Sequence, residues 1–299
     1  MRKTSSISGI NLESNSLEIK FIDFWSSFKP KEDIVFGKTL IDTYELKISN
    51  KPDILVYSLH GDDHNKKEYD NCIKICYSAE NLKTHNLDPN KILSAGHYLI
   101  SMERIEHPNH LRLPNIVRAN FYGYNSDLIN DFSNLPQKNK FCAFVQRNCS
   151  CRYRNSFVEK LSKYKAIDCA GPCLNNFKSD ILGNRHHEGN VDFLSPYKFN
   201  IAFENSSSPG YCTEKIWWGF LAKTISLYWG DSTVYQDFNE GSFLNRHGFD
   251  SDDEFIEAII ELDNNDDAYY KMLTKPKLKD KSLIDLNRVG DFFEGIMKK

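Results

Sequence analysis

One stretch of this sequence, residues 197–230, brings acidic, amide and basic side chains together at the ends of predicted secondary-structure elements. A short, mostly apolar run ends at Phe203 and is followed at once by Glu204 and Asn205. Such a run is typical of a buried strand, and open α/β sheets bind ligands at the carboxyl ends of their strands. The two polar side chains are therefore expected where a ligand would bind.

The same stretch continues with a loop of serine, proline and glycine at residues 206–210 and then with a helix start. Thr213 is a residue type that caps helices, and Glu214 and Lys215 fall in the first helical turn. The backbone N–H groups and the positive dipole end of a helix start suit a phosphate group. We therefore predict a site for a nucleotide or a nucleotide sugar in residues 197–230.

The elements that must position this stretch alternate between strands and helices in the second half of the chain. We expect strands at residues 141–146, 200–203 and 224–229, and helices at residues 155–164 and 213–222. Strands that alternate with helices indicate a parallel sheet. Ser251 and Glu254 form a capping-box pattern at the start of a further helix.

The first half of the chain shows a similar alternation. Strand-like runs occupy residues 17–24, 54–58 and 72–78, and residues 33–46 are compatible with a helix. The polar residues 122–140 include a proline and lack sustained periodicity, which is typical of a linker. We therefore predict two α/β domains, residues 1–130 and 131–299, with a last helix at 285–297 that could pack back on the N-terminal domain.

The composition limits the class of protein. The 299 residues, 40% of them hydrophobic, can bury two cores of ordinary size, and a net charge of −3 argues against a duplex nucleic-acid binder. No run approaches the roughly 20 apolar residues of a membrane span, and the first residues lack the apolar core of a signal peptide. We expect a soluble, cytoplasmic protein. The eight cysteines do not follow the CxxC pattern, so we expect free thiols rather than structural zinc.

Several motifs resemble those of the α1,3/α1,4-fucosyltransferases, glycosyltransferase family 10. The resemblance is strongest between Arg154 and Asp250, where FENS, YCTEK and WG stand at residues 203–206, 211–215 and 229–230. CIKICYSAEN at residues 72–81 is similar to the family's strand that carries the catalytic glutamate, and LRLP at 111–114 is similar to its RxP element. The bacterial, membrane-free members are the nearest in style. This chain ends without their heptad repeats, so dimerisation through repeats is not expected.

The resemblance implies a GT-B fold, in which two Rossmann-like domains with parallel sheets face a central cleft. It implies that the C-terminal domain binds GDP-fucose and that L-fucose is transferred with inversion to an oligosaccharide, at O3 of GlcNAc or Glc. No DxD motif stands at a suitable strand end, and the adjacent His186 and His187 cannot easily share one metal ion. We therefore expect no required cofactor, with a divalent metal at most stimulatory.

The resemblance also assigns the reacting groups. Glu80 matches the general base, because one-step inversion at the fucose C1 needs a carboxylate to take the proton of the acceptor hydroxyl. Arg154 and Lys215 match contacts to the diphosphate, where a permanent cation stabilises the departing GDP. Both cations are predicted at helix starts, where the positive end of the helix dipole disfavours a positive charge unless a nearby anion interacts with both.

Three further residues match positions that contact the donor. Asn205 and Tyr211 offer an amide and a phenol that can each donate and accept hydrogen bonds. Glu214 is expected to accept hydrogen bonds from ribose or fucose hydroxyls and to steady positive charge on the sugar ring. We therefore place Glu214 with Glu80 and Arg154 among the catalytic residues. Glu204 is expected to organise the loop by hydrogen bonds.

Each role has an alternative that needs no ligand. Glu80 could be a solvated glutamate at a strand end, and Arg154 could belong to a solvated basic cluster with Arg147 and Arg152. Glu214 at a helix N-terminus is stabilising by roughly 0.3 to 1 kcal/mol in any case. The alternative functions are another GT-B transferase with a different nucleotide sugar, or a non-catalytic protein that binds nucleotide or carbohydrate. A binder would not need the acid and the two cations together, which favours a transferase.

Overall fold

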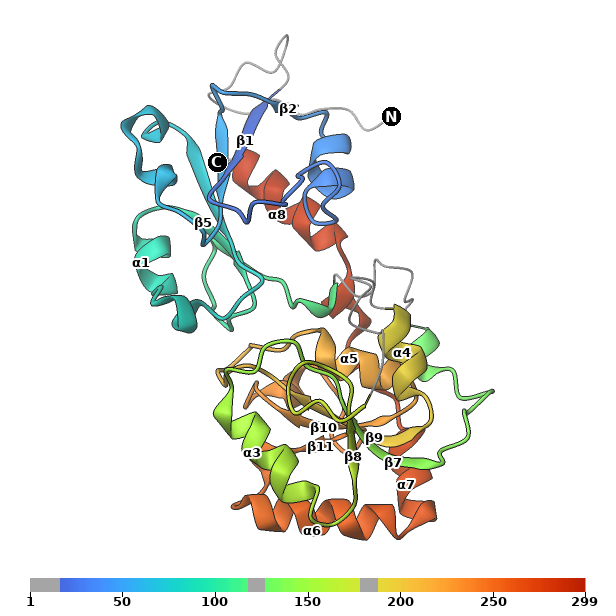
Figure 1. Ribbon diagram of the computed structural model, residues 1–299. Coiled ribbons are helices and arrows are strands. Elements are labelled where there is room, and N and C mark those ends of the chain that lie inside the picture. Colours follow the sequence, from blue (N-terminus) through green and yellow to red (C-terminus); the bar gives the residue numbers. More distant parts are fainter. Residues whose placement is uncertain (1–16, 118–126, 178–187, 299) are drawn as a thin grey trace. The chain divides into compact units, whose positions relative to one another are not determined.

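The computed structural model of the protein describes residues 17–117, 127–177 and 188–298. The chain forms two compact units, each with one β-sheet and flanking helices (Figure 1). The first unit holds residues 17–117 and 284–298, and the second holds residues 127–177 and 188–283. Neighbouring strands in both sheets run parallel. The predicted α/β fold with two parallel sheets is confirmed.

The first unit contains a six-stranded sheet in the order β2-β1-β3-β4-β5-β6. Its strands are β1 (Glu18–Ile22), β2 (Lys47–Ile48), β3 (Ile54–Tyr57), β4 (Ile73–Tyr77), β5 (Tyr98–Ser101) and β6 (His110–Arg112). Its helical segments are η1 (Gly37–Asp42), η2 (Asp63–Asn65), η3 (Lys67–Tyr69), η4 (Leu82–His85), α1 (Pro89–Ser94) and α8 (Asn287–Met297). All four residues of β3 are buried, as expected for a central strand covered on both faces.

The last helix of the chain, α8, belongs to this first unit. Val289, Phe293 and Ile296 recur at helical spacing and lie in the same buried core as Ile19 of β1. Burying each such side chain contributes roughly 1.5 to 3 kcal/mol. The predicted boundary lay between residues 130 and 131. Residues 127–130 already belong to the second unit, so the observed boundary lies earlier in the chain.

The second unit contains a five-stranded sheet in the order β11-β10-β9-β7-β8. Its strands are β7 (Lys140–Phe144), β8 (Ile167–Cys169), β9 (Tyr197–Phe203), β10 (Ile225–Trp229) and β11 (Leu244–Asn245). Its helices are α3 (Arg152–Leu161), α4 (Glu188–Leu194), α5 (Glu214–Leu221), α6 (Asp252–Asp263) and α7 (Asp266–Leu273), with short 3-10 turns η5 (Leu128–Asn130), η6 (Val234–Gln236) and η7 (Arg246–Gly248). The turn η8 (Lys281–Ile284) leads back to the first unit.

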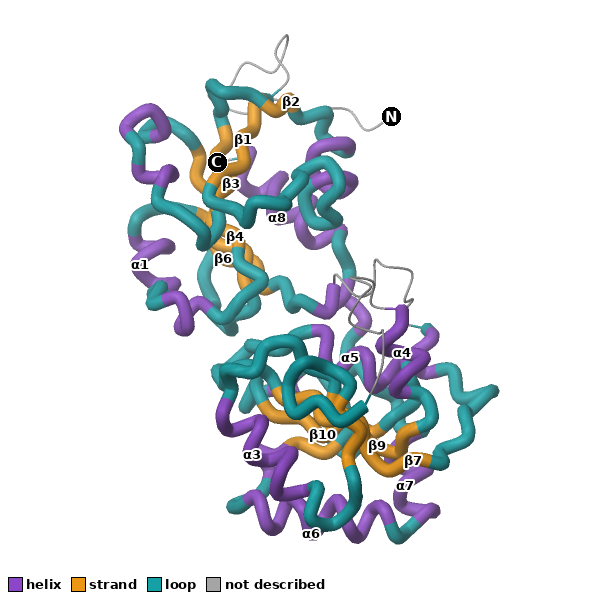
Figure 2. The backbone as a smooth tube through the Cα atoms, in the orientation of Figure 1, coloured by secondary structure: helices purple, strands orange, loops and turns teal. Residues whose placement is uncertain are grey.

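Helices cover both faces of the second sheet, as Figure 2 shows in purple around the orange strands. Every second residue of β9 points into the core that α3, α6 and α7 cover, namely Phe199, Ile201 and Phe203. Asn200 lies on the opposite face under α5, where a Cβ added to Gly219 would come within 2.5 Å of the Asn200 Oδ1. A glycine at that position therefore allows α5 to pack directly against the sheet.

The connections create a switch point in each sheet. From β7 the chain passes through α3 to β8 on one side, and then returns to β9 on the other side of β7. In the first unit, β2 and β3 lie on opposite sides of β1 in the same way. Connections that diverge at such a point leave a crevice at the carboxyl ends of the strands, where α/β proteins bind ligands.

Candidate functional site

The carboxylate of Glu204 lies at the centre of the candidate site, directly after β9. Its side chain is fully buried and accepts hydrogen bonds from the Thr213 backbone N–H at 2.7 Å, the Thr213 hydroxyl at 2.7 Å and Lys215 Nζ at 2.9 Å. Thr213 does occupy the N-cap position of α5, but its side chain makes no capping bond and donates to Glu204 instead. A protein carboxylate therefore already lies at the start of α5, where it holds Thr213 and Lys215, and the predicted phosphate site there stays a prediction.

Glu204 also accounts for the unusual position of Lys215 in a first helical turn. Burial raises the pKa of Glu204, and the Lys215 ammonium opposes that rise. Burial would lower the pKa of Lys215, but Glu204 and Glu214 outweigh it and raise that pKa above its ordinary value. The Lys215 ammonium lies 3.7 Å from Glu214 Oε1, and the Lys215 side chain is only 14% exposed. Two carboxylates thus hold this lysine charged and in place.

Arg154, in the first turn of α3, is the second cation of the site. Its side chain is fully buried, and the guanidinium donates to the Phe203 carbonyl at 3.2 Å, to Asn205 Oδ1 at 2.8 Å and to the Asn148 carbonyl. Burial lowers the pKa of this group. No carboxylate among the described residues forms an ion pair with it. The buried Glu204 carboxylate stabilises this charge electrostatically without pairing with it, and a nearby anionic ligand would stabilise the arrangement further.

Asn205 and Tyr211 lie next to the two cations. Because Arg154 binds the Asn205 oxygen, the amide NH₂ group is directed away from the guanidinium and can donate to a ligand. Tyr211 is buried, and its side chain interacts electrostatically with both Arg154 and Lys215. Together with Glu214, whose side chain is 30% exposed, the five predicted donor-binding residues therefore gather at the carboxyl ends of β7 and β9.

Asp231, which the sequence analysis missed, fixes the loop between β9 and α5. Its fully buried Oδ1 accepts hydrogen bonds from the Gly210 N–H at 2.8 Å and the Thr233 N–H at 2.8 Å. Gly210 has a φ of 87°, a conformation that favours glycine. A Cβ added to Gly230 would lie 2.4 Å from Glu204 Cγ. The sequence signal was an aspartate immediately after a strand-end glycine, followed two residues later by threonine.

A disulfide between Cys149 and Cys173 joins the loops that follow β7 and β8. The expectation of free thiols throughout is therefore wrong for these two cysteines. Cys149 directly follows Asn148, whose carbonyl accepts from Arg154. The disulfide thus lies one residue from the site. Among the described residues, no group of histidine, cysteine and acidic side chains is arranged to hold a metal ion.

The predicted base, Glu80, lies in the first unit, in the turn after β4. It is exposed, and its backbone N–H donates to Ser78 Oγ at 3.0 Å while the Ser78 hydroxyl donates to the Glu80 carbonyl at 2.9 Å. Ser78 is itself buried and its N–H donates to the Ile100 carbonyl of β5. The turn is therefore anchored to the sheet and presents the carboxylate at the carboxyl end of β4. His186 and His187 lie outside the described residues.

Two family descriptions match the chain. Residues 19–119 match "Alpha-(1,3)-fucosyltransferase FucT N-terminal domain", and residues 135–278 match "Glycosyltransferase family 10 (fucosyltransferase) C-term". The protein belongs to glycosyltransferase family 10. Both units of this family 10 protein thus match, including the turn with Glu80 and the loop from Glu204 to Lys215.

Known proteins with similar sequences or structures agree with this assignment. The family 10 protein is 37% identical over 146 residues to alpha-(1,3)-fucosyltransferase FucT of Helicobacter pylori, covering 49% of this chain and 29% of that protein. It is 31% identical over 140 residues to GDP-fucose protein O-fucosyltransferase 3 of Xenopus tropicalis, covering 44% and 29%. The matched stretch spans less than a third of these curated relatives.

A crystal structure of an alpha1,3-fucosyltransferase with GDP is similar in fold, with a TM-score of 0.75 at 24% identity. The match covers 99% of this chain and 94% of that one. It shows that the two parallel sheets are those of the GT-B fold. Within the described residues, no helix has the length and apolar character to cross a membrane.

Proposed function

We propose that this family 10 protein transfers L-fucose from GDP-fucose, with inversion, to a hydroxyl of an acceptor oligosaccharide, at O3 of GlcNAc or Glc. The observation that carries the proposal is Arg154, a fully buried cation at a topological switch point that has no carboxylate partner among the described residues. A diphosphate adds negative charge beside Arg154 to that of Glu204, which stabilises the guanidinium without an ion pair. The names of the relatives point to the same donor, since they include fucosyltransferases and a GDP-fucose-dependent enzyme.

The donor site works through cations that the fold holds in place. The positive charge of Arg154 and its hydrogen bond to Asn205 direct the Asn205 NH₂ group toward the diphosphate. Lys215, charged and held by Glu204, stabilises the negative charge that develops on the β-phosphate as GDP leaves. We therefore propose that the reaction needs no divalent metal, because these two cations supply the stabilisation that a metal gives elsewhere.

The transfer itself is a single displacement. The acceptor oxygen attacks the fucose C1 from the face opposite GDP, the bond from C1 to the phosphate oxygen breaks, and Glu80 takes the proton of the acceptor hydroxyl. Glu80 is suited to this role because its anchored turn leaves it exposed. Glu214 accepts hydrogen bonds from sugar hydroxyls and stabilises positive charge at the ring as C1 separates from GDP. A cytoplasmic location stays a prediction.

The test combines Glu80→Gln with a panel of donors and acceptors. Calorimetry with GDP and transfer assays with GDP-fucose, other nucleotide sugars, oligosaccharides and a peptide acceptor separate binding from chemistry. We expect Glu80→Gln to bind GDP as the wild type does and to lose at least 100-fold in kcat. Glu68→Gln, at an exposed glutamate before β4, is the matched control and retains activity. Near-normal turnover by Glu80→Gln, or no GDP binding by the wild type, would refute the proposal.

A further inference from the structure

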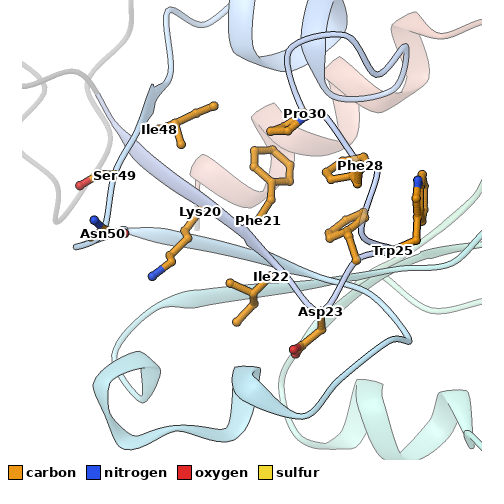
Figure 3. Close-up of a pocket in the computed structure, with 11 residues that line it drawn as sticks. Lys20, Phe21, Ile22, Asp23, Trp25, Phe28, Pro30, Ile48, Ser49 and Asn50 are labelled. Atoms are coloured by element: carbon orange, nitrogen blue, oxygen red, sulfur yellow. The ribbon is translucent and has the colours of Figure 1, made fainter.

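A cavity in the first unit lies along β1 and the segment that follows β2. It has a volume of about 470 Å³, within the range of ~300 to 1,000 Å³ that small-molecule sites occupy. Figure 3 shows the rings of Phe21, Phe28 and Trp25 on one side of the β1 ribbon, with Lys20 and Ile22 on the other. The cavity lies on the side of β1 that faces the short strand β2.

The aromatic rings of this cavity form one continuous, partly exposed surface. Phe24 and Phe28 stack with ring centroids 3.9 Å apart, and Trp25 meets Phe28 at 5.0 Å, edge to face. Each ring is only half-buried. Phe21, Phe24 and Phe28 also pack against the buried core of the first unit, which holds their rings in place while part of each stays accessible. The flat rings can stack on the apolar face of a sugar ring.

Polar groups border the aromatic surface. β2 pairs with β1 only at Glu18 and Ile19, so no described strand covers the edge of β1 at Phe21. Ser49 and Asn50, which follow β2, line the cavity on that side. Aromatic faces bordered by hydrogen-bonding groups match a pyranose, which has an apolar face and a rim of hydroxyls.

The shape of the edge argues against a peptide strand as the occupant. A strand added to an edge needs several successive backbone groups to pair with. The edge of β1 ends almost at once, because Asp23 adopts a φ of 58° and its carboxylate accepts hydrogen bonds from the His64 N–H at 3.0 Å and its ring Nδ1 at 2.7 Å. The chain therefore turns away after Ile22, and too little edge remains for strand addition.

The carboxyl end of β1, which borders the cavity, lies level with the carboxyl end of β4, which precedes the turn that carries Glu80. Ile22, Tyr57 and Cys76 are in register across β1, β3 and β4, so the ends of these strands are level. Phe24 stacks near Tyr77 at 6.2 Å. β1 and β4 are two strand spacings apart, which is about 10 Å. An oligosaccharide with its reacting hydroxyl at Glu80 can reach this cavity, whereas a monosaccharide cannot.

We propose that this cavity, formed by Phe24, Trp25, Phe28 and the residues around Asn50, is a subsite for a sugar of the acceptor distant from the reacting hydroxyl. The inference rests on the proposed transferase function and adds the place where a longer acceptor is recognised. Occupancy of the subsite lowers the KM for oligosaccharides and leaves donor binding and transfer to a single sugar unchanged.

Two variants test the subsite in the full chain. Trp25→Ala removes part of the aromatic surface, and Asn50→Trp fills the cavity from an exposed position without removing any core contact. Asn71→Trp, also at an exposed position before a strand but absent from the lining of the cavity, is the matched control. KM and kcat are measured with N-acetylglucosamine and with oligosaccharides of increasing length, alongside the Kd for GDP, the melting temperature and the oligomeric state.

We expect Asn50→Trp and Trp25→Ala to raise the KM for the longer acceptors at least tenfold, with the KM for N-acetylglucosamine and the Kd for GDP within twofold of wild type. Asn71→Trp should match wild type throughout. An unchanged oligosaccharide KM in Asn50→Trp overturns the subsite even if Trp25→Ala misfolds. A defect confined to a peptide acceptor, or a loss of self-association with no change in KM, assigns the cavity to another occupant and also overturns it. Failure of the wild type to bind GDP or transfer fucose instead refutes the proposed function.

Discussion

Replacing Glu204 by glutamine removes the charge from the carboxylate that organises the candidate donor site while keeping its shape. The fully buried side chain accepts from two groups of Thr213 and from Lys215. Removing one member of a buried ion pair costs about 3 to 5 kcal/mol. Lys215 keeps Glu214 at 3.7 Å, so we expect the lower end, about 3 kcal/mol. At about 2 to 4 °C per kcal/mol, the melting temperature of the second unit falls by about 6 to 12 °C.

The same substitution should weaken nucleotide binding, because Glu204 holds both Lys215 and the backbone of Thr213 in position. Ordering these groups again on binding costs free energy, and a loss of about 1.4 kcal/mol corresponds to a tenfold weaker Kd. We expect at least this tenfold loss for GDP by calorimetry, with the melting temperature measured by circular dichroism.

The matched control is Asp263→Asn, which removes another buried carboxylate of the same unit. Asp263 accepts from Tyr164 at 3.0 Å and pairs with Lys198 at 3.2 Å, near the start of β9. Glu204 lies six residues beyond Lys198 along the strand, which is about 20 Å. We expect Asp263→Asn to lower the melting temperature and leave GDP affinity unchanged. If Glu204→Gln kept both the melting temperature and GDP affinity of the wild type, the assigned role of the carboxylate would be wrong.

Three further predictions follow from individual contacts. Gly230→Ala places a Cβ 2.4 Å from the buried side chain of Glu204 and should lower the free energy of unfolding by about 1 to 3 kcal/mol in a denaturant titration. Gly248→Ala is the control, because its Cβ would meet no atom within 4 Å and should leave that free energy unchanged. Equal effects of the two substitutions would contradict the explanation by crowding. Burial raises the pKa of Asp252, but hydrogen bonds from lysine, arginine and tyrosine side chains hold it at about 2. The ionised Asp252 therefore stabilises the folded protein by about 2 kcal/mol above the unfolded pKa near 3.8, and this contribution is lost as pH falls toward 2. The free energy of unfolding of the wild type should accordingly fall more steeply between about pH 4 and 2 than that of Asp252→Asn. Parallel curves of unfolding free energy against pH would exclude the ion-pair role. Cys173→Ser removes the disulfide that closes a loop between two residues 24 apart in the sequence, and should lower the free energy of unfolding by about 3 kcal/mol and weaken GDP binding. Thiols are counted in the unfolded, unreduced protein to check the bond itself. Six thiols are expected, and eight would show that the Cys149–Cys173 bond is absent.

The thiol count also bears on where the protein works. Disulfides are rare in reducing compartments, so a bond between Cys149 and Cys173 that persists in protein taken directly from cells would argue against the cytoplasmic location predicted from the sequence.

Much of the architecture is present in local sequence pattern. The apolar run ending at Phe203, the helix start at Thr213 and the capping pattern at Ser251 each depend on neighbouring residues, and all three elements form where expected. At Ser251 the hydroxyl accepts from the Glu254 N–H at 3.1 Å, although the Glu254 side chain accepts from the Asp250 N–H rather than from Ser251. The strands β2, β5, β6, β8 and β11 were not predicted, because runs of two to four residues rarely show periodicity.

The partners of the charged residues could not be read from the sequence. Arg154 and Lys215 were recognised from the sequence as cations at helix starts, where the helix dipole disfavours a positive charge. The groups that bind them come from distant parts of the chain in the case of Arg154, and include the buried Glu204 carboxylate in the case of Lys215. Arg154 binds Phe203 and Asn205, about fifty residues further along, because the parallel sheet places β7 beside β9. The sequence alone therefore determined the residue types and their elements. Only the tertiary structure decided which charges meet, that the last helix completes the first unit, and that an aromatic cavity lies beside β1, because packing rather than spacing along the chain sets these contacts.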